Sequence, residues 1–317
     1  MSKPVITVKN LIKSYKGSDK PAVNNISFNV GEGEFFAFLG PNGAGKTTTI
    51  SILTTTLSKT SGELRIAGFD VDKEARQVRE QIGIIFQQPS LDPNLSAEEN
   101  IRFHACLYGM CGYRPDFKMM PAAYRKKVLE LAEMTGLQDV LGKSVKKLSG
   151  GMQRKLEIIR SLIHTPRVLF LDEPTQGLDA VSRRGLWDYI NTVRNQYGTT
   201  VFLTTHYIDE AENTDRVCVI NHGKIVSLNT PDEMKRKLLR QELIVDAADR
   251  NALKAELSSL ELHYKANGQI VVPLMGRTAQ ELISKIKTPL SMLKIHDPSL
   301  EDAYVELLNK NSEGDAA

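Results

Sequence analysis

The stretch Gly40-Pro41-Asn42-Gly43-Ala44-Gly45-Lys46-Thr47 decides how the rest of this 317-residue sequence is interpreted. It fits the pattern G-x-x-x-x-G-K-[ST] completely, and its glycines let backbone N–H groups approach a phosphate without a Cβ in the way. A helix pattern begins near Lys46 and directs the positive end of its dipole to the same place. Lys46 supplies an ammonium for the β- and γ-phosphates, and the Thr47 hydroxyl suits Mg²⁺. The octapeptide therefore predicts a site for nucleotide phosphates, against the alternative of a glycine-rich turn that happens to hold a lysine.

The segments around this loop predict an α/β fold. Phe35–Leu39, directly before the loop, is a continuous apolar run, as expected of a strand buried on both faces of a parallel sheet. Residues 168–171 and 200–204 have the same character, and a helix pattern at 182–197 separates them. Strand, helix and strand at this spacing form a parallel crossover unit. A helix at 46–57 is predicted to follow the loop.

Two acidic residues, Asp172 and Glu173, directly follow the apolar run at 168–171. Carboxylates at the carboxyl end of a parallel strand face the crevice where ligands bind in open α/β sheets. Asp172 is in the right place to hold Mg²⁺, and Glu173 to polarise an attacking water. Alone, the pair also fits a simple helix start. Together with the phosphate loop, it predicts the second half of the site.

A second glycine-rich helix start lies at Leu148-Ser149-Gly150-Gly151-Met152-Gln153. Serine and two glycines before a helix pattern form another anion-binding N-terminus, although the same residues also fit a simple helix cap. At this point the sequence resembles the ATP-binding cassette (ABC) family, whose LSGGQ-like signature precedes the acidic strand. Here Met152 takes the fifth position and Gln153 follows, which leaves the Ser-Gly-Gly core intact.

The resemblance covers roughly residues 4–230 and implies both a fold and further roles. It implies a P-loop NTPase whose RecA-like core carries an antiparallel β-subdomain and a helical subdomain, with ATP and Mg²⁺ as cofactors. Tyr15 matches the aromatic residue that stacks on adenine, and Gln87 matches the glutamine that contacts Mg²⁺ and water. Asp179 matches the aspartate of the loop that communicates between subunits. His206 matches the switch histidine that contacts the γ-phosphate.

The loop motif and the resemblance together predict three overlapping sets of site residues. The catalytic set is Glu173, His206, Gln87 and Lys46. The metal-binding set is Thr47, Gln87 and Asp172. The nucleotide-binding set is Tyr15, Gly40, Pro41, Asn42, Gly43, Ala44, Gly45, Lys46, Thr47, Thr48, Ser149, Gly150, Gly151 and Asp179.

The predicted domain order has three parts. An ABC nucleotide-binding domain at 1–228 contains a helical subdomain at about 88–164, and a linker helix follows at 229–241. The remainder, 242–317, reads β-α-β-β-α-β-α and is predicted to be a small α+β accessory or regulatory domain. Its tail at 298–304 resembles that of exporter-type cassettes linked to drugs, lipids or cell-surface glycans.

Composition limits the classes of function. Lys and Arg number 41 and Asp and Glu 38, and a net charge of +3 gives little field for gripping a nucleic acid. No apolar run approaches the ~20 residues that span a bilayer. Three cysteines (Cys106, Cys111 and Cys218) cannot form a disulfide framework, so a reducing cytoplasm is expected.

The leading interpretation is the ATP-hydrolysing subunit of an ABC transporter, of the exporter type, at the cytoplasmic face of the membrane. It implies an integral-membrane permease on a separate chain and a head-to-tail pair of nucleotide-binding domains, a homodimer because both half-sites look complete. One alternative is a soluble cassette ATPase acting on ribosomes or DNA; a single phosphate loop and the lack of heptads count against it. Another is a small-molecule kinase, which has no use for Ser149-Gly150-Gly151 together with His206.

Overall fold

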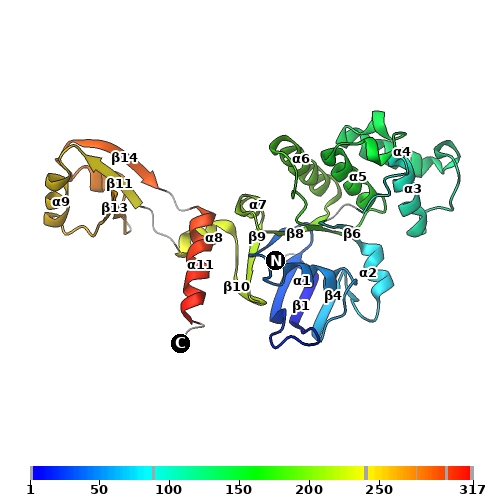
Figure 1. The fold of residues 1–317 in the computed structure, drawn as a ribbon, viewed down its shortest axis with the longest axis horizontal. Helices are drawn as coiled ribbons and strands as arrows, with labels where there is room; N and C mark the ends of the chain where they lie inside the picture. The colour runs from blue at the N-terminus through cyan, green and yellow to red at the C-terminus, as the bar shows by residue number, and fades with distance from the viewer. Residues whose placement is uncertain (1–2, 88–89, 239–241, 276, 297–298, 315–317) are drawn as a thin grey trace. The chain divides into compact units, whose positions relative to one another are not determined.

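The chain folds into two compact units, Met1–Leu228 and Asn229–Ala317. The computed structural model (Figure 1) describes residues 3–87, 90–238, 242–275, 277–296 and 299–314. None of the helices in these ranges is both long enough and apolar enough to cross a bilayer.

A six-stranded sheet forms the centre of the first unit, with the strand order β10-β9-β3-β8-β7-β6. Its strands are β3 (Phe35–Leu39), β6 (Ile82–Ile85), β7 (Val168–Asp172), β8 (Thr200–Thr205), β9 (Arg216–Asn221) and β10 (Lys224–Asn229). The strands β9, β3, β8, β7 and β6 run parallel. Because the carboxyl ends of parallel strands share one edge, the residues that follow β3, β6, β7 and β8 come together there.

Both faces of this sheet are covered, which explains why β3, β7 and β8 are buried at every residue. Alternate side chains enter different cores. On one face Phe36, Phe170 and Phe202 pack together, with the rings of Phe36 and Phe202 5.4 Å apart. On the other face Leu169 and Leu203 join a core with the helical region. The apolar runs in the sequence thus correspond to strands with two buried faces.

An antiparallel sheet and α1 (Lys46–Leu53) share the core on the first of these faces. The sheet has the order β2-β1-β4-β5, from β1 (Pro4–Lys13), β2 (Val23–Gly31), β4 (Ser61–Ile66) and β5 (Phe69–Asp70). The short helix α2 (Ala75–Gln81) leads from there to β6.

Helices cover the opposite face (Figure 1). They are α3 (Ala97–Leu107), α4 (Ala122–Thr135), α5 (Gly150–Leu162) and α6 (Ala180–Tyr197), with α7 (Ile208–Glu212) after β8. The capping box that the sequence predicts before α3 is confirmed, because the Ser96 hydroxyl and the Glu99 carboxylate each bind the other's backbone N–H. Residues 88 and 89, where the helical subdomain is predicted to begin, lie outside the described residues.

The second unit contains a four-stranded sheet of order β12-β13-β11-β14. Its elements are β11 (Glu242–Ala247), α9 (Arg250–Ser259), β12 (Lys265–Asn267), β13 (Gln269–Pro273), α10 (Ala279–Ile283) and β14 (Leu290–His296). The predicted order of strands and helices is confirmed. Outside the sheet, α8 (Pro231–Leu238) and α11 (Leu300–Gly314) contact each other. Residues 239–241 of the predicted linker helix, and Pro298 of the tail, lie outside the described residues.

Some predicted boundaries were wrong, for local reasons. The helix after the phosphate loop ends at Leu53 and not at 57, because Thr55 takes a left-handed φ of 62°, which the α-helix cannot accommodate. The helix predicted from 182 begins at Ala180, where the Asp179 side chain caps it.

Candidate nucleotide-binding site

The loop between β3 and α1 is built so that only glycine fits at two of its positions. A Cβ at Gly40 would lie 2.3 Å from the carbonyl oxygen of Ile220. Gly45 has a φ of +105°, and a Cβ there would lie 2.5 Å from the carbonyl oxygen of Ala22. The loop therefore packs directly against neighbouring backbone, which fixes its shape ahead of α1.

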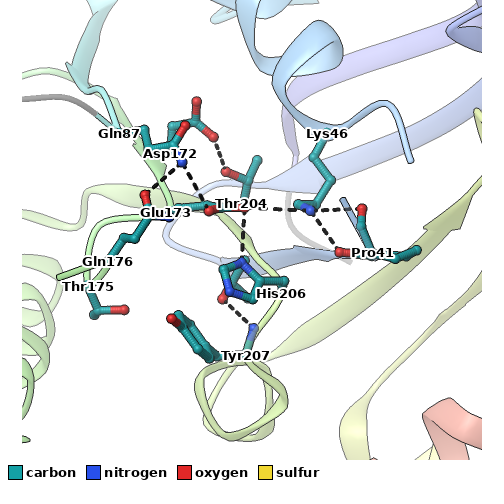
Figure 2. A network of polar contacts seen from close by, with 12 residues as sticks. Pro41, Lys46, Gln87, Asp172, Glu173, Thr175, Gln176, Thr204, His206 and Tyr207 are labelled. Carbon is teal, nitrogen blue, oxygen red and sulfur yellow. Dashed lines mark hydrogen bonds and ion pairs between the residues drawn. The ribbon is translucent and has the colours of Figure 1, made fainter. Parts of the chain in front are cut away.

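The ammonium group of Lys46 lies inside this loop. Its Nζ donates to the carbonyl oxygens of Gly40 (2.7 Å) and Pro41 (3.1 Å) and lies 3.6 Å from Oε1 of Glu173 (Figure 2). Burial lowers the pKa of Lys46, and the charges of Glu173 and Asp172 oppose that effect. A nearby phosphate would favour the charged form in the same way.

Asp172, the last residue of β7, is buried at the end of the sheet. The hydroxyl of Thr204, on the neighbouring strand β8, donates to its carboxylate. Burial raises the pKa of Asp172, and the hydrogen bond from Thr204 and the charge of Lys46 partly offset the rise. The site thus holds a carboxylate that would gain from a cation beside it.

The oxygen donors at this edge fit Mg²⁺. In the described part of the chain, no group of three His, Cys, Asp or Glu side chains could hold a metal by itself. Mg²⁺ is usually held by one or two carboxylates together with phosphate oxygens and water. A hydroxyl (Thr47), an amide oxygen (Gln87) and a carboxylate (Asp172) are hard oxygen donors of the type it prefers.

Glu173 is the centre of the polar network in Figure 2. It follows β7 with a left-handed φ of 45°, and its backbone N–H donates to the Thr204 carbonyl. Its Oε1 lies 3.1 Å from Nδ1 of His206, and its Oε2 lies 3.4 Å from Nε2 of Gln87. An unusual φ at a non-glycine residue often marks a functional position. Here it brings the carboxylate between the histidine and the lysine.

The loop that carries His206 is tied to the loop after β7 by a residue that the sequence did not reveal, Glu210. The hydroxyls of Thr205 (2.6 Å) and Thr175 both donate to the buried carboxylate of Glu210. Burial raises the pKa of Glu210, against the effect of these two hydrogen bonds. The ring of Tyr207 lies against that of His206, with the ring centres 4.1 Å apart and the planes tilted by 38°. The only sign of this role in the sequence was the position of an acidic residue, Glu210, four residues after His206.

A second unpredicted residue, Arg154 of α5, joins the loops after β6 and β7. Its Nε donates to the Pro174 carbonyl (2.7 Å), and one Nη donates to the Phe86 carbonyl (2.6 Å). The same nitrogen pairs with the fully buried Glu157 at 2.8 Å. Phe86 and Pro174 are far from Arg154 in the sequence, so no local pattern points to these two contacts.

A cavity of about 340 Å³ lies at this edge of the sheet. It is lined by Ala22, Asn42, Gly43, Gly45, Lys46, Thr47, Thr48, Gln87, Glu173, Gln176 and His206. All but Ala22 and Gln176 belong to the sets predicted from the sequence. Tyr15, predicted to stack on adenine, is 45% exposed, and its hydroxyl lies 3.4 Å from that of Thr48.

The second glycine-rich helix start and Asp179 do not line this cavity. Ser149 caps α5 and accepts from the Met152 N–H, while Asp179 caps α6. The two helix starts are neighbours, because a Cβ on Gly151 would lie 2.7 Å from the Ser182 hydroxyl. The structure therefore brings together the phosphate loop, the acidic pair, Gln87 and His206. The Ser-Gly-Gly turn lies outside the lining of this cavity.

Comparison with known proteins places this geometry in a family. The ABC transporter family matches residues 23–176. The Nod factor export ATP-binding protein I of Burkholderia orbicola is 33% identical over 98% of this chain and 99% of its own length. The probable multidrug ABC transporter ATP-binding protein YbhF of Escherichia coli is 37% identical over 75% of this chain. The aligned part is only 39% of YbhF.

A solved structure confirms the predicted P-loop NTPase fold. The ATP-binding cassette MJ0796, in a dimeric post-hydrolysis state with ADP and Pi, is 30% identical to this chain. The two superpose with a TM-score of 0.61 over 71% of this chain and 98% of the cassette. The chain therefore belongs to the ABC transporter family, as one of its ATP-binding ATPase cassettes.

Proposed function

We propose that this ABC ATPase powers an exporter by ATP-dependent, head-to-tail pairing of two copies of the chain. Its partner in the membrane is an integral permease on a separate chain, and it works at the cytoplasmic face. The observation that carries the proposal is the position of Glu173, 3.1 Å from His206 Nδ1 and 3.6 Å from Lys46 Nζ, beside the cavity of the phosphate loop. The names of the relatives, which include Nod factor export and multidrug transport, support the exporter type.

In this proposal the phosphate loop holds the triphosphate and Tyr15 stacks on the adenine. The Lys46 ammonium, now on the loop carbonyls, turns to the β- and γ-phosphates, and the Thr48 hydroxyl lies beside them. Thr47, Gln87 and Asp172 would hold Mg²⁺. When bound, the cation neutralises charge on the phosphate oxygens.

Glu173 is the proposed general base for the attacking water. Its carboxylate is buried but opens on the cavity, so it is held in one position with little competition from solvent. His206 lies against it and is placed to contact the γ-phosphate. Gln87 contacts the same carboxylate from the opposite loop and orients the water.

The second copy supplies the missing side of the site. The turn Ser149-Gly150-Gly151 of one copy would cover the γ-phosphate bound by the other copy. Asp179 would take part in communication between the two subunits. None of these residues lines the cavity of its own chain, and a relative is dimeric with ADP and Pi bound; both observations support this arrangement. Since ATP would then be part of the interface, loss of its γ-phosphate releases contacts on both sides and drives opening.

We assign ATP binding and hydrolysis to residues 1–228, the nucleotide-binding domain, which includes the helical subdomain at about 88–164. Residues 229–241 act as a linker, and 242–317 form an accessory or regulatory domain. The separate hydrophobic core of the sheet β12-β13-β11-β14 supports an independent role for that domain.

The test of the proposed function is Glu173→Gln. Without the base, hydrolysis should fall about 100-fold or more, while ATP still binds and the dimer accumulates. Phosphate release gives the rate, and light scattering after gel filtration with ATP gives the oligomeric state. Glu133→Gln, an exposed glutamate on α4, is the matched control. Hydrolysis by Glu173→Gln at the wild-type rate would overturn the assignment of the base.

A further inference from the structure

Gln176 lines the cavity and contacts Gln87 directly. The Nε2 of Gln87 donates to the Oε1 of Gln176 at 2.7 Å (Figure 2). The two glutamines follow β6 and β7, which are neighbouring parallel strands paired through Ile85 and Leu171. The contact therefore joins two loops at the carboxyl edge of the sheet.

The two ends of a glutamine amide differ in what they can bind. Its oxygen can ligate a cation, whereas its nitrogen only donates hydrogen bonds. The Gln87 nitrogen lies 3.4 Å from the Glu173 carboxylate, which accepts hydrogen bonds when ionised, and 2.7 Å from the Gln176 oxygen. These two acceptors match the two hydrogens of the nitrogen. The oxygen is then the end of the amide that remains for a ligand in the cavity.

The surrounding structure fixes the distance between the two loops. The buried guanidinium of Arg154 donates to the carbonyl of Phe86, one residue before Gln87, and to that of Pro174, two residues before Gln176. The backbone N–H of Gln176 donates to the Glu173 carbonyl at 3.2 Å. Gln176 is thus held at this place by backbone contacts that do not depend on its side chain.

We propose that Gln176 is a positioning residue that orients the Gln87 amide, so that its oxygen faces the cation bound with ATP. The inference rests on the proposed function, which assigns Mg²⁺ to Gln87. Without the Gln176 acceptor, the amide also adopts the flipped orientation, which presents N–H groups to a cation and repels it. Loss of such a supporting partner lowers metal affinity by about tenfold or more.

The test compares Gln176→Leu, which removes the acceptor, with Gln176→Glu, which keeps it. Mn²⁺ binding is measured by electron paramagnetic resonance in the presence of a non-hydrolysable ATP analogue. Gln176→Leu should weaken Mn²⁺ binding about tenfold, and Gln176→Glu should bind Mn²⁺ at least as tightly as the wild type. Affinity for the analogue in EDTA should be unchanged in Gln176→Leu, which adds no charge to the cavity lining. Gln196→Leu, an exposed glutamine on α6, is the control for folding.

A double-mutant cycle with Gln87→Leu tests whether Gln176 changes Mn²⁺ affinity through Gln87. If Gln176 acts through Gln87, adding Gln176→Leu to Gln87→Leu changes Mn²⁺ affinity no further. Wild-type Mn²⁺ affinity in Gln176→Leu, or an equal loss in the Gln87→Leu background, would overturn the inference and leave the proposed function intact. Failure of the wild-type protein to bind the analogue would instead refute the proposed function.

Discussion

At the scale of single residues, burial of charge governs the phosphate site. Lys46 and Asp172 are both buried beside the cavity, and burial shifts their pKa values in opposite directions, downward for the lysine and upward for the acid. Each shift means that the charged form has lost solvation that its neighbours only partly replace. A triphosphate with a cation would supply both missing charges. The residues that suit the proposed ligand therefore lower the stability of the ligand-free protein.

The cost of burying Asp172 is measurable as a dependence of stability on pH. The folded-state pKa is raised, so the group favours the folded state below the ordinary aspartate pKa, and this contribution is lost as pH rises through the folded pKa. Asp172→Asn cannot ionise and keeps a side-chain oxygen for Thr204. It should therefore melt about 2–4 °C above the wild type near pH 7.5 without nucleotide.

The same comparison near pH 4 provides the check on mechanism, because the advantage of Asp172→Asn should shrink there as the wild-type carboxyl takes up its proton. Thermal unfolding of the nucleotide-free protein at the two pH values is the measurement. Asp139→Asn, at an exposed position, should change neither melting point. A melting point of Asp172→Asn at or below that of the wild type near neutral pH would contradict the argument.

At the scale of elements, the guanidinium of Arg154 joins α5 to the loops after β6 and β7. Arg154 pairs with Glu157, which is fully buried, and the carboxylate of Glu157 also accepts from the Ser90 N–H. Arg154→Met would remove the counter-charge that is hydrogen-bonded to this buried carboxylate and leave only the charge of Arg160 near it. The substitution should cost about 3 kcal/mol of unfolding free energy. Urea unfolding measures the change.

Two comparisons show whether the buried charge is the cause. Arg154→Met combined with Glu157→Gln should cost less than the two single changes added together, because no charge is then left unpaired. Arg76→Met, which breaks the exposed pair with Glu80 on α2, should cost less than about 1 kcal/mol. An equally small loss in Arg154→Met would show that the guanidinium does not hold these elements together.

Elements whose ends are set by their own sequence were predictable, and those whose ends depend on neighbours were less so. The Ser96 capping box and the apolar run Phe35–Leu39 contain the complete signal for their helix and strand. The end of α1 was predicted too late, since Ile52 and Leu53 pack into the core while the apolar Leu57 lies beyond the turn at Thr54.

The same distinction applies to the site. Lys46 was predicted from the phosphate-loop motif and Glu173 from the acidic end of a buried strand, whereas His206 was predicted from the resemblance to the ABC family. The sequence did not assign a role to Glu210 or Arg154, because their partners come from loops that meet only in the folded chain.

At the scale of the whole molecule, the position of the Ser-Gly-Gly turn supports the proposed pairing of two chains at one active site. The turn does not line the cavity of its own chain, so a phosphate bound there is in contact with one glycine-rich helix start and not with both. In the proposed dimer, two copies related by a two-fold axis would exchange these surfaces and complete two sites at once. The proposal therefore predicts that defects in the two surfaces complement each other.

Two variants provide that test. Lys46→Ala removes the phosphate contact, and Gly150→Asp places a negative charge at the turn. A Cβ at Gly150 meets nothing within 4 Å, so this substitution should not disturb the chain's own fold. Each variant alone should hydrolyse ATP at the background rate. An equal mixture forms mixed dimers in half of the pairs, with one intact site in each, so about a quarter of the wild-type rate should return.

A further substitution in one of the two chains shows which phosphate loop forms the active site of the mixed dimer. Adding Glu173→Gln to the Gly150→Asp chain, whose phosphate loop is intact, should abolish the recovered hydrolysis, whereas adding it to the Lys46→Ala chain should not. This asymmetry follows because the base must act on the nucleotide held by its own phosphate loop, 3.6 Å from its own Lys46. Background hydrolysis in every mixture would mean that one chain completes its site without the other's turn, and head-to-tail pairing would have to be abandoned.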